Sequence, residues 1–305
     1  MSVATLPGYD SARERIAHRD RGSAVLDVGG EDRVAFLQGQ LTQEMRGLAP
    51  GETRDAAGLT PKGKLLFVAR AVGLADRIRL VLPAALRAPV FEHLLKYVLG
   101  SRVTVEDRSE ELFRIGLYGP AAASLDVPAG VFLLPAEGEF SAELLGPAAI
   151  RAEVGRLLEE AGSEEVAEGT AEILRIEAGR PRFGTDMDST NLPDEVGLPR
   201  AISTTKGCYV GQEVVARLRT YGRVNRRFVR FRFPEGRIDP GTPLRRPEEE
   251  TPGKIEAGRV TSSAVSPESG PIGLGYAFRE ILDGDRLVST VASGDIAIVS
   301  DLASV

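Results

Sequence analysis

Cys208 is the residue whose type and surroundings point most directly to chemistry. It lies in the segment KGCYVGQE, residues 206–213, between Gly207 and Gly211 and just ahead of a run that predicts a helix. A thiol at a helix N-terminus meets the positive end of the helix dipole, which favours the thiolate, and Lys206 adds positive charge. We predict that Cys208 is a reactive or transiently metal-ligating cysteine assisted by Lys206. The alternative is an ordinary buried cysteine.

The counts of cysteine and histidine exclude several kinds of site. Cys208 is the only cysteine, and His18 and His93 are the only histidines. The chain by itself therefore cannot form a disulfide, a Cys-rich zinc site or an iron–sulfur cluster site. We expect no permanently bound metal. His93 is assigned a structural or solvent-facing role.

A second candidate lies in the segment TAEILRIEAGRPRFG, residues 170–184. As a helix from about residue 171, it places Glu177 one turn after Ile173 on the apolar face, while Glu172 and Arg175 face elsewhere. A carboxylate that faces the interior needs hydrogen-bond donors. Two interpretations follow, a structural ion pair with an arginine such as Arg180, or contact with a ligand that presents an amidine-like N–H edge.

The long irregular stretch 181–205 contains four acidic residues that suggest a divalent metal site, and a stretch of this length is usually functional or disordered. Their spacing does not fit an EF-hand, so we interpret them as part of a solvated loop. They are Asp186, Asp188, Asp194 and Glu195.

Residues 214–234 hold seven arginines and no acidic residue, although the chain as a whole carries a net charge of −6. Such a positive patch suits a phosphate backbone, an anionic tail or an acidic partner. The alternative is a half-exposed strand in which Val229 and Phe231 alternate with Arg230 and Arg232. Because few aromatic residues are interleaved to stack on bases, weak RNA contact is a secondary hypothesis.

The pattern of apolar runs predicts an α+β body followed by a small β-region. Strands are expected near residues 24–28, 65–72, 77–82 and 113–118, with helices over 84–99 and 147–161. Two helices would cover one face of an antiparallel sheet. After residue 222 the chain carries short β-like runs without a helical pattern, which predicts a separate C-terminal β-barrel or sandwich over 223–305, after an α+β region over 1–222.

Composition and missing motifs narrow the function further. The chain has 305 residues with 42% apolar and 27% charged residues, typical of a soluble globular protein. No run approaches the ~18 apolar residues of a membrane helix, and the N-terminus lacks the apolar region of a secretory signal, so we expect a cytoplasmic protein without membrane contact. The P-loop, the dinucleotide-binding glycine motif and the serine-hydrolase elbow are absent, which disfavours those chemistries.

KGCYVGQE resembles the signature of the YgfZ proteins, folate-binding iron–sulfur maturation factors related to the T-protein (aminomethyltransferase) of glycine cleavage. Two further segments are similar to that superfamily, GEDRVAFLQGQLTQEM at residues 30–45 and ILRIEAGRPRFGTDMD at residues 173–188. The resemblance implies an α+β, GcvT-like cloverleaf of ferredoxin-like lobes with a C-terminal β-barrel, arranged around an opening that holds tetrahydrofolate or a derivative.

The resemblance also implies roles for individual residues. The glutamate of the matching T-protein segment binds the pterin, and its counterpart here is Glu177. A carboxylate accepts the pterin's paired N–H groups side by side, which now favours the ligand interpretation. We infer that the arginine patch holds the glutamate tail of the folate. The candidate folate-binding set is Glu177, Arg175, Gln212, Arg217 and Arg223.

One departure from T-proteins separates two functional hypotheses. Phe67 and Val68 occupy the positions of the acids that follow a Gly-rich turn in the enzyme, and an apolar side chain cannot polarise the reacting folate nitrogen. The first hypothesis is a folate-binding accessory factor for assembly or repair of iron–sulfur enzymes, including tRNA-modifying ones, with such enzymes or scaffold proteins as partners. The second is a folate-dependent aminomethyltransferase-type one-carbon transferase.

Overall fold

The structure is a computed structural model that describes residues 6–22, 24–135, 140–247, 256–291 and 296–300. The chain divides into two compact units, each built from two separate segments. Unit 1 comprises residues 1–170 and 199–212, and unit 2 comprises residues 171–198 and 213–305. Relative to the expected boundary after residue 222, residues 171–198 and 213–222 group with the C-terminal strands.

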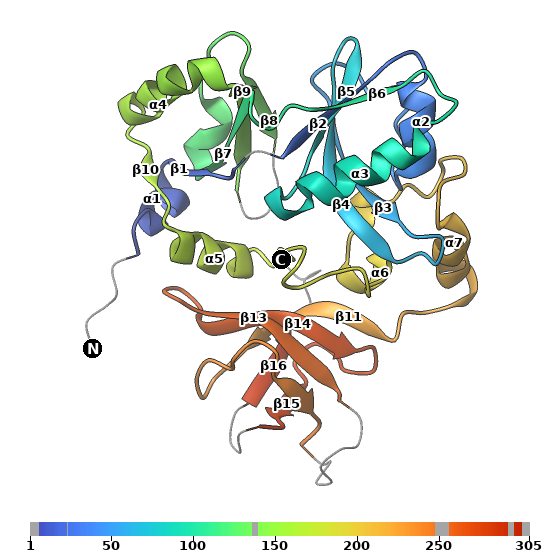
Figure 1. The fold of residues 1–305 in the computed structure, drawn as a ribbon. Coiled ribbons are helices and arrows are strands. Elements are labelled where there is room, and N and C mark those ends of the chain that lie inside the picture. The colour runs from blue at the N-terminus through green and yellow to red at the C-terminus, as the bar shows by residue number, and fades with distance from the viewer. Residues whose placement is uncertain (1–5, 23, 136–139, 248–255, 292–295, 301–305) are drawn as a thin grey trace. The chain divides into compact units, whose positions relative to one another are not determined.

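The first sheet of unit 1 has the strand order β10-β1-β7-β9-β8, and all neighbours are antiparallel except β1 and β10. Helix α4 covers it with Val154 and Leu158, which are buried against strand residues such as Ile115 and Leu144 (Figure 1). The elements of this lobe are α1 (Tyr9–Glu14), β1 (Ala17–Asp20), β7 (Leu112–Tyr118), β8 (Phe132–Pro135), β9 (Ala142–Pro147), α4 (Arg151–Glu160) and β10 (Glu164–Glu165).

The second sheet of unit 1 has the antiparallel order β3-β4-β5-β2-β6. Alternate residues of β4 are buried, as expected for a strand with one face on a core. Leu37 of α2 and Val90 and Leu94 of α3 are buried on the helices of this lobe. Its elements are β2 (Val25–Gly29), α2 (Arg33–Gln40), β3 (Thr53–Leu59), β4 (Leu65–Gly73), β5 (Arg77–Val81), α3 (Arg87–Tyr97) and β6 (Thr104–Asp107).

The two sheets of unit 1 contact each other through an apolar cluster that includes Val72 and Val81 from one sheet and Leu145 from the other. Beside this cluster, the buried carboxylate of Glu143 pairs with Arg114, whose guanidinium also donates to the carbonyl oxygen of Leu82 at 3.0 Å. A buried charge requires such partners, so this pair helps to fix the two sheets against each other.

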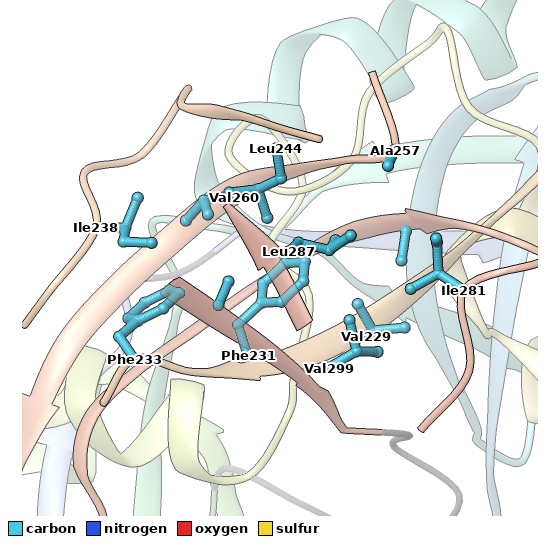
Figure 2. Close-up of a cluster of buried hydrophobic side chains, with 12 residues drawn as sticks. Val229, Phe231, Phe233, Ile238, Leu244, Ala257, Val260, Ile281, Leu287 and Val299 are labelled. Atoms are coloured by element: carbon cyan, nitrogen blue, oxygen red, sulfur yellow. The ribbon is translucent and has the colours of Figure 1, made fainter. Parts of the chain in front are cut away.

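Unit 2 contains a closed barrel with the strand order β11-β14-β13-β12-β15-β16. Phe231, Val260 and Leu287 lie inside it, and Phe231 stacks on Phe233 with ring centroids 6.2 Å apart (Figure 2). The helices of unit 2 are α5 (Glu168–Glu177, whose first turn belongs to unit 1), α6 (Pro193–Val196) and α7 (Gln212–Tyr221). The strands are β11 (Arg226–Arg232), β12 (Pro243–Arg245), β13 (Gly258–Ser266), β14 (Gly270–Phe278), β15 (Arg286–Ser289) and β16 (Ile296–Ser300).

The predicted α+β class with a C-terminal barrel is confirmed, and most predicted elements are present with shifted ends. The helix expected over 84–99 is a 3₁₀ turn (Ala84–Leu86) followed by α3, and the helix expected over 147–161 begins as α4 only at Arg151. Asp32 precedes α2, and its carboxylate accepts hydrogen bonds from Arg102 instead of capping the helix. Within the described ranges, no helix is both long and apolar enough to cross a membrane.

We expect Phe231→Ala to lower the free energy of unfolding by about 3–5 kcal/mol, because it removes a fully buried ring from the barrel core and leaves a cavity. Phe231→Leu should cost less, since most of the buried volume is retained. Arg232→Gln, on the exposed neighbouring position, serves as the control. Urea denaturation followed by circular dichroism measures all three. Equal losses for Phe231→Ala and Arg232→Gln would contradict this packing.

Candidate functional site

Cys208 is exposed and forms no disulfide, which is the opposite of the buried-cysteine alternative. It lies in a loop of unit 1, four residues before α7 begins at Gln212. The sequence analysis placed the thiol at the N-terminus of this helix, but the helix begins four residues later. The exposure makes the thiol available to a partner or to a metal ion.

Lys206 is buried beneath this loop, with 6% of its surface exposed. Its Nζ donates to the carbonyl oxygens of Gln38 at 2.7 Å, Leu41 at 2.5 Å and Gln43 at 3.1 Å. These carbonyls lie at and just beyond the C-terminal end of α2, where the helix dipole is negative and attracts a cation. An ammonium has three N–H donors, so no donor of Lys206 is left for Cys208. Lys206 is thus a residue that positions the loop.

The remaining residues of the loop are fastened to the same part of unit 1. The amide of Val210 donates to the carbonyl oxygen of Gly39 at 3.1 Å, and the buried Tyr209 ring lies 4.9 Å from the Lys206 Nζ. Gly211 has a φ of +82°, and a Cβ there would lie 2.5 Å from the carbonyl oxygen of Thr60. Only glycine fits so close to the β3–β4 turn in this conformation.

Gln212 closes the loop through two hydrogen bonds with the main chain of Tyr209. Its Oε1 accepts from the amide of Tyr209 at 3.3 Å, and its own amide donates to the Tyr209 carbonyl oxygen at 3.2 Å. Residues on both sides of Cys208 are therefore held, while Cys208 and Gly207 remain exposed. The motif presents one thiol on an anchored loop.

Glu177 lies at the C-terminal end of α5, half-buried, in unit 2. Its Oε1 accepts from the hydroxyl of Ser266 at 2.6 Å, and its main-chain carbonyl oxygen accepts from Arg230 Nη2 at 2.5 Å. Burial lowers the pKa of Arg230, and the nearby charge of Glu177 opposes that shift. These two partners, Ser266 and Arg230, come from β13 and β11.

Arg175 is almost completely buried, at 1% exposure, whereas the helical periodicity predicted that it faces away from the apolar side. All of its N–H donors are used within unit 2. They reach both carboxylate oxygens of Glu172 at 3.0 and 2.6 Å, Asp186 at 2.6 Å, the carbonyl oxygen of Arg180 at 2.5 Å and Ser262 Oγ at 2.7 Å. No donor is left for a ligand, so Arg175 positions α5 against β13.

The hydrogen bonds and charges around Arg175 raise the pKa of its guanidinium by more than its burial lowers it. Desolvation alone would lower the pKa of its guanidinium, but the hydrogen bond to Glu172 and the charge of Asp186 raise it. Asp186 accepts further hydrogen bonds from Thr261 at 2.5 Å and Ser262 at 2.7 Å. The arginine and the aspartate of the segment resembling T-proteins therefore form a structural pair.

The interpretation of the acidic residues as a solvated loop is wrong for three of the four. Asp186 is buried against Arg175, Asp194 pairs with Arg219 at 2.8 Å, and Glu195 approaches Arg226 at 3.4 Å. The reason is that residues 185–198 pack within unit 2, where arginines of α5, α7 and β11 meet them. Asp188 is exposed and caps a turn through the Thr190 amide at 2.7 Å.

The arginine run divides into engaged and exposed members. Arg226 lies 4.8 Å from the Tyr276 ring, and Arg227 donates to the carbonyl oxygen of Ile281 at 2.9 Å. Arg217 and Arg223 are exposed, and within the described residues neither has a carboxylate partner. These two remain available to an anionic ligand.

Phe67 is a core residue of β4, at 1% exposure, and its ring contacts His93 of α3 with centroids 5.8 Å apart. Val68, the next residue, is half-buried on the opposite face of the strand. His93 also lies 5.0 Å from the ring of Tyr97, and burial lowers its pKa. The positions that the resemblance matched to the acids of T-proteins therefore hold a buried and a half-buried apolar side chain.

The predicted site residues are distributed over both units. Cys208, Lys206 and Gln212 belong to unit 1, and the other members, Glu177, Arg175, Arg217 and Arg223, belong to unit 2. Sequence reasoning missed Ser266 as the partner of Glu177. No local signal identifies it, because it follows Glu177 by 89 residues and is brought close only by the barrel.

No family model matches the sequence. The fold is similar to that of the glycine cleavage system aminomethyltransferase T from Bartonella henselae, with a TM-score of 0.84, 22% identity and coverage of 96% of this chain and 87% of that one. Fold and cysteine loop together define an aminomethyltransferase-fold protein with an exposed thiol on an anchored loop.

Sequence similarity identifies the family. The chain is 30% identical to the tRNA-modifying protein YgfZ of Hamiltonella defensa over 235 residues, covering 70% of this chain and 68% of that protein. It is 24% identical to the human mitochondrial iron–sulfur cluster assembly factor IBA57 over 92% of this chain and 82% of that protein. Alignments with further YgfZ proteins span 66% of their length. The chain belongs to the YgfZ family.

We expect Lys206→Met to lower the free energy of unfolding by about 1–3 kcal/mol, because three carbonyl oxygens lose their donor while the volume of the side chain is largely kept. Lys96→Met on the exposed face of α3 is the control. Chemical denaturation compares the two variants. If Lys206→Met is as stable as Lys96→Met, the ammonium does not hold the loop.

Burial lowers the pKa of Lys206 from 10.5 to about 8 in the folded protein. Between these two pH values the unfolded chain binds more protons than the folded one, so the contribution of Lys206 to the free energy of unfolding rises with pH. The free energy of unfolding of wild type, relative to that of Lys206→Met, should therefore increase from pH 8 to pH 10.5. Denaturation at several pH values measures it, and a constant difference would contradict the shift.

Removing Arg175 should destabilise unit 2 by about 3–5 kcal/mol, because Arg175→Met leaves Asp186 as a buried charge without its counterion. Adding Asp186→Leu should restore part of the loss. Arg182→Met is the matched control, since Arg182 pairs with the same Glu172 at 2.8 Å but its side chain is 41% exposed, against 1% for Arg175, and the substitution should cost less than about 1 kcal/mol. Thermal unfolding distinguishes them. Equal losses for both single variants would contradict a buried pair.

Proposed function

We propose that this chain is a cytoplasmic, tetrahydrofolate-binding accessory protein for the assembly or repair of iron–sulfur enzymes, with Cys208 as its reactive residue. The observation that carries the proposal is the exposed Cys208 on a loop held from both sides by Lys206, Tyr209 and Gly211. A thiol held in this way can ligate iron or exchange with a partner's thiol. The relatives named as a tRNA-modifying protein and an iron–sulfur cluster assembly factor support the same role.

One thiol cannot bind a cluster alone, because clusters are held by several cysteine ligands. The other ligands would come from an iron–sulfur enzyme or a scaffold protein, which we propose as the partners. An exposed thiol on an anchored loop suits this role, since it can enter a partner's site without a rearrangement of the loop. A cluster or iron ion is cargo in this proposal and not a resident metal.

The residues of unit 2 fit a folate chemically. The half-buried carboxylate of Glu177 accepts one hydrogen bond from Ser266, and a carboxylate has about four acceptor positions, so it can also receive the paired N–H groups of a pterin. Arg217 and Arg223 are exposed cations suited to the carboxylates of the folate tail. Arg175 and Gln212 would act indirectly, by positioning α5 and the Cys208 loop. When bound, a folate supplies a carrier of one-carbon groups.

The second candidate function is a folate-dependent aminomethyltransferase-type one-carbon transferase, supported by the similarity to aminomethyltransferase T in fold. Against it stands the apolar packing of Phe67, since general acid–base work on a folate nitrogen needs a titratable group at that point. Formation of methylene-tetrahydrofolate with turnover by the purified protein would support this second function over the first.

The decisive experiment joins a genetic rescue with a binding assay. In a strain deleted for the gene and under oxidative stress, wild type should restore the activity of a [4Fe–4S] enzyme and Cys208→Ser should not. Cys208→Ser should bind tetrahydrofolate as wild type does, whereas Glu177→Gln should bind about ten-fold or more weakly, because a charged acceptor is lost. Titration calorimetry measures both affinities.

Thr204→Ala, at an exposed position of the same loop, is the matched control and should rescue fully. Full rescue by Cys208→Ser would remove the thiol from the mechanism. Loss of folate binding in Cys208→Ser would contradict the separation of the two roles. An iron–sulfur enzyme that keeps its activity in the deletion strain would overturn the accessory function and leave the transferase as the better hypothesis.

A further inference from the structure

Tyr221 is the most exposed aromatic side chain among the described residues, at 89%, and it ends helix α7. Arg217 lies one turn before it on the same face of the helix. The two line an open hollow of about 370 Å³ together with Val214 and Leu218. Neither side chain is part of a core, so the ring and the guanidinium are both open to solvent.

A second hollow of about 680 Å³ adjoins the first, because both are lined by Leu218 and Gly222. Arg223 and Arg279 border it, and both are exposed. We call the continuous surface formed by Arg217, Tyr221, Arg223 and Arg279 the α7 surface. All of it belongs to unit 2.

The charges on the α7 surface are unevenly paired. Asp194 is already bound to Arg219 at 2.8 Å, so that pair is neutral. Glu213 and Glu280 also line the hollows, against three arginines that have no carboxylate partner within the described residues. The local surplus is positive, although the whole chain carries −6. Any attraction of a polyanion must therefore be local rather than a property of the whole protein.

We propose that the α7 surface binds an unpaired segment of RNA, with a base stacked on Tyr221 and phosphates held by Arg217, Arg223 and Arg279. Single-stranded nucleic acids are recognised by aromatic rings that stack on bases and by arginines that follow the backbone. Simple polyanion binding would not require Tyr221. An apolar protein partner would require more exposed apolar surface than the half-buried Val214 and Leu218 provide.

The RNA proposal does not depend on the proposed thiol chemistry or on the Glu177 carboxylate. Neither Cys208 nor Glu177 belongs to the α7 surface, so a failure of the Cys208→Ser or Glu177→Gln test leaves the RNA proposal unaffected. Arg217 and Arg223 are shared with the proposed folate tail, which can be tested by competition. Tyr221 belongs to the RNA proposal only and is the residue that decides it.

Fluorescence anisotropy with a labelled oligo-uridine of about 12 nucleotides tests the proposal on the full-length protein. Tyr221→Ala should weaken binding about ten-fold, and Tyr221→Phe should bind as wild type, since the ring stacks. Three phosphate contacts predict that the logarithm of the binding constant falls with the logarithm of the salt concentration with a slope of about −2. Arg217→Gln should make this slope less steep by about 0.7. Controls are Tyr97→Ala, at a ring 49% exposed on α3, and Arg156→Gln at an exposed position of α4.

Three outcomes would overturn the proposal. One is no measurable binding at low salt. Another is equal weakening by Tyr221→Ala and Tyr97→Ala, which would mean that no base stacks on Tyr221. The third is equal competition by inorganic polyphosphate or by poly-glutamate, which carry charge but no bases, and which would assign the surface to a plain polyanion or an acidic protein segment. Circular dichroism of each variant confirms that the fold is retained.

Discussion

The ammonium of Lys206, bound to three main-chain carbonyl oxygens at the end of α2, is the interaction on which the candidate site depends most. It joins a loop near residue 208 to a helix about 170 positions earlier in the chain. Buried cations are tolerated only when their donors are satisfied, and here the number of acceptors equals the number of donors. The loop therefore has one stable conformation, and that conformation leaves Cys208 exposed.

A second buried cation has the same function in unit 2. Arg175 fastens α5 to β13 through Asp186 and Ser262, and so determines where α5 ends. Glu177 follows two residues later and meets Ser266 of the same strand. Because removal of one partner of a buried pair leaves an uncompensated charge, the network has a strong preference for a single geometry. The carboxylate proposed for folate is thus carried by a rigid support.

The two sequence motifs around Cys208 and Glu177 consist largely of residues that hold the structure. In KGCYVGQE, Lys206, Tyr209, Gly211 and Gln212 hold the loop, and the Cys208 thiol is exposed. In the segment around Glu177, the arginine and aspartate pair with each other. The same division applies to the arginine run, in which Arg227 and Arg230 of β11 are bound to partners in unit 2, while Arg217 and Arg223 are exposed.

The sequence by itself determined the α+β class, the C-terminal barrel and the family resemblance, because these depend on local periodicity and on contiguous motifs. The same motifs marked Cys208 and Glu177 as candidate site residues. It did not determine the burial of Arg175, the pairing of three of the four loop acids or the orientation of Lys206 away from the thiol. Each of these depends on a partner that is distant in sequence, such as Ser262 or the carbonyl oxygen of Leu41. Helical periodicity indicates which face is apolar, but only tertiary structure decides which buried cation finds enough acceptors to be stable there.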